Sequence, residues 1–184
     1  SEYTGNPDLM RIWSLCVHTQ RYGVQEVIQD CMEREKGFYL GDGCYTAATH
    51  ALLTGKDDML RKLIDDAFLT EFITDTLMTC MNGSFMQEIA DYSLQFPLHA
   101  LKYYELTGDK DFLRDAYETC LGIQQYFTKY EREDGILSGI REKGNMVDWP
   151  QNYLDGYDCD VLGANATEVA SARAHNVLNA FYVG

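Results

Sequence analysis

A pattern that occurs three times constrains the fold of this chain more than any other feature of its sequence. Each copy reads Thr, Gly, any two residues, Asp, two apolar residues and Arg, and the glycines Gly5, Gly55 and Gly108 stand 50 and 53 residues apart. Glycine readily takes the left-handed conformation that ends many helices, and an acidic or proline-led segment follows each glycine as a helix start. Each copy therefore predicts a tight αα-hairpin turn.

The segments on either side of these turns have the composition of helices. We expect helices to enter the turns over residues 45–53, 92–106 and 167–183, and to leave them over residues 7–22, 57–78 and 111–130. A single hairpin cannot bury its apolar face without neighbours, so a period of about 50 residues with two helices is typical of toroids and solenoids. The sequence thus predicts an all-α fold.

The connections between hairpins separate these two architectures. The three returns, residues 23–44, 79–91 and 131–166, are long and rich in glycine, aromatic and acidic residues. TPR-like and HEAT-like arrays use short turns at both ends of each unit, whereas long loops on one face of a rigid helical frame usually carry binding and catalysis. We therefore expect αα-hairpin repeats that form about half of an (α/α)6 toroid, as one partial domain over residues 1–184.

Charge and cysteine spacing exclude several classes of partner. With 29 acidic against 15 basic residues the net charge is -14, which repels nucleic acid and anionic membranes but is compatible with a neutral carbohydrate. The six cysteines lack the paired spacing of a zinc site, so no metal and no cofactor are expected. The sequence contains no run of 18 apolar residues, so no membrane span is expected. The cellular compartment stays open.

The first return contains the segment that is richest in charge and glycine. Residues 30–43 read DCMEREKGFYLGDG, and Gly37, Gly41 and Gly43 predict backbone that turns sharply there. The spacing of the acidic residues does not fit one solvated helical stripe across the whole segment. We therefore expect an irregular loop up to Gly43.

Three carboxylates of this loop are candidates for chemistry. Hydrolysis of a glycosidic bond needs one protonated carboxyl beside the leaving oxygen and a second carboxylate that activates water or attacks. Asp30, Glu35 and Asp42 could supply the acid and companions that bind the sugar, and Phe38 and Tyr39 could desolvate a neighbour and raise its pKa. The alternative from spacing alone is a solvated acidic loop that caps the next helix.

The same loop resembles the signature of the α-L-rhamnosidases, glycoside hydrolase family 78. In that signature an Asp-Cys-x-x-Arg-Glu run precedes an aromatic residue, two further residues and Asp, and the matching positions are Asp30, Cys31, Arg34, Glu35, Tyr39, Gly41 and Asp42. Residues 91–94, a helix ending at residues 103–109, and the pair Asp148-Trp149 are similar to further landmarks in the same order. The resemblance covers most of the chain.

The resemblance implies roles for these residues. Glu35 would be the general acid, Asp30 and Asp42 would bind sugar hydroxyls, and the reaction would invert configuration through a water molecule. The general base would lie far downstream, outside this chain, so the fragment alone is expected to be inactive. The implied substrate is terminal α-linked rhamnose in glycans or glycosides. Met32 stands where the family commonly has Pro, and Tyr39 where it often has Trp, which leaves the exact sugar open.

Other residues and other functions remain as alternatives. Arg34 and Trp149 are further candidates for sugar binding, and Trp149 could equally anchor its own loop. A toroid glycosidase with another sugar preference, or a helical binding or scaffolding module without turnover, would also fit the repeat. A half-ring leaves apolar flanks uncovered at both ends, so self-association of the chain is expected.

Overall fold

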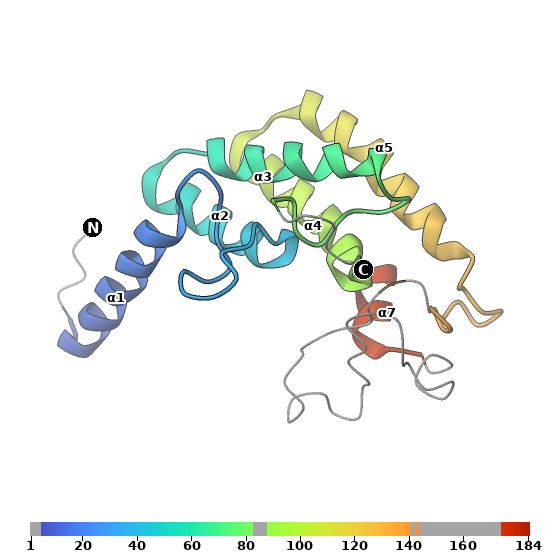
Figure 1. Cartoon of the computed structure of the whole chain (residues 1–184), viewed down its shortest axis with the longest axis horizontal. Coiled ribbons are helices and arrows are strands. Elements are labelled where there is room, and N and C mark those ends of the chain that lie inside the picture. The colour runs from blue at the N-terminus through green and yellow to red at the C-terminus, as the bar shows by residue number, and fades with distance from the viewer. Residues whose placement is uncertain (1–4, 83–87, 141–142, 144–173) are drawn as a thin grey trace.

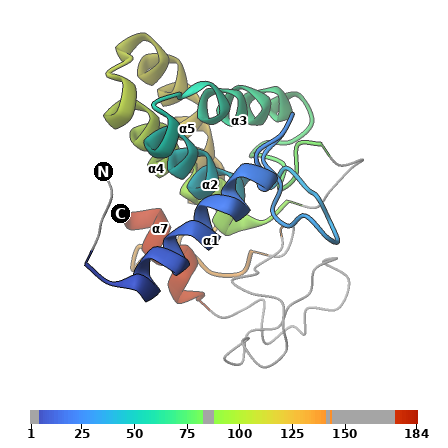
Figure 2. The ribbon, with the colours of Figure 1, turned by 90° about the vertical axis from the view of Figure 1, so that its left-hand side faces the viewer.

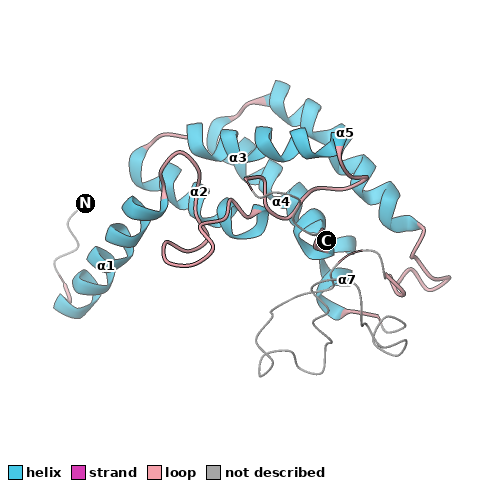
Figure 3. Ribbon diagram, viewed as in Figure 1, coloured by secondary structure: helices cyan, strands magenta, loops and turns pink. Residues whose placement is uncertain are grey.

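The computed structural model describes residues 5–82, 88–140, 143 and 174–184. These residues form helices joined by loops, with no strand among them (Figure 3). None of the described helices is both long and apolar enough to span a membrane. The all-α prediction is confirmed. The elements are α1 (Pro7–Gly23), α2 (Leu40–Thr54), α3 (Asp58–Leu69), the 3-10 helix η1 (Thr70–Phe72), α4 (Ala90–Thr107), α5 (Lys110–Thr128) and α7 (Asn176–Val183).

The two fully described Thr-Gly turns have the same structure. Gly55 and Gly108 are left-handed, with φ of 72° and 71°, and each ends the helix that enters the turn. The Thr54 hydroxyl donates to the carbonyl one turn earlier at 2.8 Å and accepts the N–H two residues later at 3.2 Å. Thr107 makes the same two bonds at 2.9 and 3.2 Å. The predicted hairpins α2–α3 and α4–α5 are therefore confirmed.

The helices follow an arc in which neighbouring hairpins pack side by side (Figure 1). Helix α4 lies at its centre and contacts α2, α3, α5 and α7. Aromatic side chains fill the space between the hairpins: the ring centroid of Phe68, on α3, is 5.6 Å from that of Phe96 and 6.2 Å from that of Phe112. Phe96 is completely buried. The hydrophobic core thus runs between hairpins, as expected for units that cannot bury their apolar faces alone.

The arginine of the repeat pattern joins one hairpin to the next. The Arg61 guanidinium lies over the Phe112 ring at 5.0 Å and stands 3.6 Å from the Asp109 carboxylate. Asp109 also accepts the N–H of Phe112 at 2.9 Å and so caps the start of α5. The repeat therefore encodes both the turn and part of the contact between neighbouring turns.

Two helix boundaries differ from the sequence predictions. Helix α2 begins at Leu40, five residues before the predicted start, so Gly41 and Gly43 lie in its first turn and not in an irregular loop. The helix predicted over residues 57–78 ends at Leu69 and continues only as η1. Of the last predicted helix, residues 167–173 lie outside the described residues, and α7 occupies its C-terminal part.

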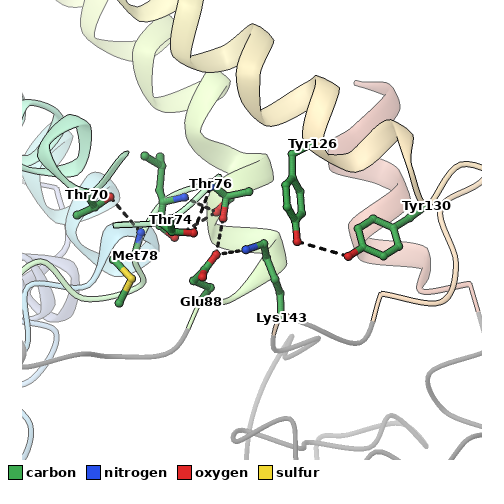
Figure 4. A network of polar contacts seen from close by, with 10 residues as sticks. Thr70, Thr74, Thr76, Met78, Glu88, Tyr126, Tyr130 and Lys143 are labelled. Atoms are coloured by element: carbon green, nitrogen blue, oxygen red, sulfur yellow. Dashed lines mark hydrogen bonds and ion pairs between the residues drawn. The ribbon is translucent and has the colours of Figure 1, made fainter. Parts of the chain in front are cut away.

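Polar contacts fix the loop between η1 and α4 (Figure 4). The Thr70 hydroxyl accepts the N–H of Met78 at 3.1 Å. Glu88, near the start of α4, accepts the Thr76 hydroxyl at 2.8 Å and also pairs with the buried amine of Lys143. Burial lowers the pKa of Lys143 to about 8, with the charge of Asp75 acting in the opposite direction. This network holds the loop that supports the candidate site.

Candidate active site

The candidate loop rests against the neighbouring return in an antiparallel arrangement. Leu40 N–H donates to the Thr79 carbonyl at 2.9 Å, and Met81 N–H donates to the Phe38 carbonyl at 3.0 Å. The Asn82 side chain accepts the N–H of Phe38 at 2.7 Å. The sequence had led us to expect that Phe38 covers a carboxylate of the loop. Phe38 is instead fully buried in the core and anchors the loop.

Asp30 closes the loop that carries the other candidates. Its backbone N–H donates to the Gly37 carbonyl at 3.0 Å, and its side chain accepts the Gly37 N–H at 2.7 Å. A Cβ at Gly37 would lie 2.3 Å from the Tyr39 ring, so a larger residue there would have to displace that ring. Burial would raise the pKa of Asp30, but N–H donors from Cys31 and Gly37 and a bond to Glu35 outweigh it and lower that pKa. Asp30 is therefore held as a carboxylate.

Glu35 projects from this closed loop and has the opposite shift. The pKa of Glu35 is raised, mainly by a hydrogen bond shared with Asp30 and to a smaller extent by partial burial. The positive charge of Arg34 acts in the opposite direction. The Arg34 guanidinium lies 2.5 Å from the Glu35 carboxylate, whose side chain is 37% exposed. Tyr39 also bonds to Glu35, and burial followed by the Glu35 charge raises the pKa of Tyr39 to about 12, so it stays a donor. The loop thus lowers the pKa of Asp30 and raises that of the accessible Glu35.

Asp42 lies at the start of α2, three residues after Tyr39. It is exposed, and its carboxylate accepts the hydroxyl of Tyr92, on α4, at 2.8 Å. Tyr39 and Tyr92 interact electrostatically, which connects Asp42 to the surroundings of Glu35. Asp42 is the acidic residue in the first turn of α2.

A further carboxyl near the site was missed by the sequence reasoning. Asp91, in the first turn of α4, is 4% exposed, and its Oδ1 has no hydrogen-bond partner among the described residues. Its Oδ2 accepts the Gln95 amide at 3.2 Å. Burial, with a smaller contribution from the Asp42 charge, raises the pKa of Asp91 to about 7. The signal available in the sequence was position: Asp91 opens an entering helix, as Asp42 does.

The structure therefore brings together four of the predicted site residues, Asp30, Arg34, Glu35 and Tyr39. Asp42 contacts Tyr92 of the next hairpin. Trp149 lies outside the described residues. Asp30, Cys31 and Glu35 offer ligand atoms within 4.8 Å of one another, close enough to hold one ion. The Arg34 charge on Glu35 opposes a cation there, and the shared hydrogen bond between the two carboxyls suits proton donation instead.

Comparison with known families identifies the family of the chain. A family model described as the bacterial alpha-L-rhamnosidase 6 hairpin glycosidase domain matches residues 3–183, almost the whole chain. The hairpins α2–α3 and α4–α5 are helical units of the kind that its description names. No solved structure was found to match the chain. The resemblance drawn from the loop motif is thus confirmed at the level of the family.

Proposed function

Because the chain belongs to the family of bacterial α-L-rhamnosidase six-hairpin glycosidase domains, we propose that it carries the general-acid half of an inverting active site. The substrate would be terminal α-linked rhamnose in glycans or glycosides. The observation that carries the proposal is the pairing of Asp30 with Glu35, which raises the pKa of one carboxyl and lowers that of the other. Paired carboxyls with opposite shifts are how glycosidases keep an acid protonated near neutral pH.

The bond-breaking step assigns a role to each of these side chains. Glu35 donates its proton to the glycosidic oxygen as the C–O bond breaks, and the negative charge remains on a carboxylate beside Arg34. Asp30 and Asp42 accept hydrogen bonds from sugar hydroxyls. Tyr39 donates to Glu35 and is well placed to stabilise the carboxylate that forms. Trp149 is the proposed aromatic surface for the sugar ring.

The water that attacks the sugar needs a second carboxylate on the opposite face. Inverting enzymes separate their two carboxyls by about 6.5–9.5 Å so that a water fits between them. Asp30 shares a hydrogen bond with Glu35 and leaves no such space, so it is unsuited to be the base. The general base is therefore proposed to lie outside this chain, and the chain alone to be inactive.

One observation favours a preference for a neutral sugar other than rhamnose. Tyr39, which stands where the family often has Trp, bonds through its hydroxyl to Glu35, a contact that an indole would make differently. The surroundings of the acid thus depart from the family pattern. A panel of aryl glycosides of rhamnose and other neutral sugars would rank the preference.

The deciding experiment is Glu35→Gln in the full-length protein that contains this chain, assayed on aryl rhamnosides. We expect kcat to fall by about 10²–10⁴-fold, because general acids contribute that much. The loss should be smaller on substrates whose leaving group needs no proton, and the alkaline limb of the pH profile should disappear. Glu33→Gln is the matched control, an exposed glutamate of the same loop. Full activity in Glu35→Gln would overturn the proposal.

A further inference from the structure

The contact between Asp42 and Tyr92 joins two hairpins at the edge of the proposed site. Asp42 belongs to the first turn of α2, and Tyr92 to the first turn of α4, 50 residues later in the chain. The phenol oxygen lies 2.8 Å from the carboxylate Oδ2, and the phenol donates. Asp42 is exposed, whereas Tyr92 is half-buried. The exposed group is thus held by a group that is fixed in the frame.

Gly41 makes this contact possible. A Cβ at Gly41 would lie 2.6 Å from Cε1 of the Tyr92 ring and 2.8 Å from its Cζ, inside van der Waals contact. The ring therefore packs directly on the backbone of α2, next to the residue to which its hydroxyl donates. The glycine of the family signature has a physical reason here: it admits the ring that holds Asp42.

We infer that Tyr92 is a positioning residue that fixes the Asp42 carboxylate for contact with the sugar. The inference rests on the proposed function, since it deepens the role given to Asp42. A free aspartate side chain at a helix start samples several rotamers, and a hydrogen bond from a held donor selects one of them. One Asp42 oxygen is then occupied, and the other is left for a sugar hydroxyl.

The donor keeps its proton under all working conditions. Burial first, and then the charge of Asp42, raise the pKa of Tyr92 well above its usual value. The bond to Asp42 therefore does not depend on pH in the range where the enzyme would be assayed. Asp91 and Tyr39 are the other titratable groups that influence Tyr92.

The test is Tyr92→Phe in the full-length protein, which removes the hydroxyl and keeps the ring on Gly41. We expect KM for an aryl rhamnoside to rise so that kcat/KM falls about tenfold, near the worth of one charged hydrogen bond. The alkaline limb of the pH profile, assigned to Glu35, should not move. Tyr182→Phe is the matched control, since its hydroxyl donates to Glu131 at 2.6 Å in another part of the molecule.

A double-mutant cycle with Asp42→Ala, which removes the acceptor, separates positioning from general damage. If Tyr92 acts through Asp42, Tyr92→Phe should change kcat/KM less than about twofold once Asp42→Ala is present. An equal loss in both backgrounds would overturn the inference, and so would an equal loss in Tyr182→Phe. Failure of the proposed function is recognised separately, because Glu35→Gln would then stay active whatever the cycle shows.

Discussion

Helices α1 and α4 have similar length and similar sequence signals but opposite surroundings. In α4, nine residues are buried, among them Phe96, His99 and Tyr103, whereas in α1 only Gly23 is buried. Both helices carry apolar side chains at helical spacing. The difference is the number of neighbours: α4 packs against four helices, while α1 lies across one end of the arc (Figure 2).

Helix α1 forms for local reasons. The Asn6 side chain caps the helix by accepting the N–H of Asp8 at 2.9 Å, and Pro7 occupies the first helical position. The acidic side chain of Asp8 in the first turn interacts favourably with the helix dipole. Its attachment to the rest is thin: the Gln20 amide donates to the Thr46 carbonyl at 2.7 Å. Capping therefore makes a helix, but only packing against neighbours gives it tertiary stability.

The largest effect should come from truncation in the centre of α4. Phe96 is fully buried against Phe68, so Phe96→Ala leaves a cavity that its neighbours cannot fill completely. We expect unfolding to become easier by about 3–5 kcal/mol. Urea unfolding of the 184-residue chain measures this. A loss below about 1 kcal/mol would mean that the α3–α4 contact is not the main source of stability.

The buried carboxyl on α4 should make stability depend on pH. The pKa of Asp91 is raised from 3.8 to about 7 by burial, so the group is neutral and tolerated at low pH. Its contribution to stability is lost as pH rises from about 4 to about 7, by about 1.4 kcal/mol for each unit. Asp91→Asn does not titrate, and we expect its advantage over the wild type to grow across that window and then stay constant.

His99, on the same face of α4, provides the control of opposite sign. Burial lowers the pKa of His99 to about 4, and its Nε2 has no partner among the described residues. The wild type should therefore lose stability relative to His99→Gln as pH falls from about 6.5 to about 4. If the stability of Asp91→Asn and His99→Gln relative to the wild type changed with pH in the same direction, the pKa shifts assigned to Asp91 and His99 would be wrong.

A smaller effect is expected at the hairpin turn. Gly108 is left-handed with no side chain nearby, so Gly108→Ala is unfavourable through its backbone alone, by about 1–2 kcal/mol. Gly122, inside α5 and also with open space around it, is the matched control. Gly122→Ala should stabilise by about 0.5–1 kcal/mol, because alanine is the better helix former. The same sign for both changes would contradict the role of the left-handed turn.

The turns were predictable because their signal is local, and the site was predictable only in part. A Thr-Gly pair makes its bonds within five residues, so the pattern alone located both described turns. Gly41 was misinterpreted as a loop residue, because the reason for its presence is the Tyr92 ring from the next hairpin. The motif made Glu35 and Asp30 candidates through the family signature, and the structure brings these two side chains together. No sequence signal near Asp91 predicts that its side chain is buried.

The smallest effect on unfolding is expected in α1, where it also tests self-association. Ile12 and Leu15 are 57% and 65% exposed, so changing both to Gln should alter the free energy of unfolding by less than about 0.5 kcal/mol. Exposed apolar side chains of this density favour association, so sedimentation should show a smaller average mass for the variant than for the wild type. A loss above about 1 kcal/mol would show that α1 is packed like α4, and a monomeric wild type would remove the expectation of self-association. If the free energy of unfolding is unchanged and the average mass is reduced, the apolar face of α1 is a surface that binds other chains. That face then contributes nothing to the stability of its own chain.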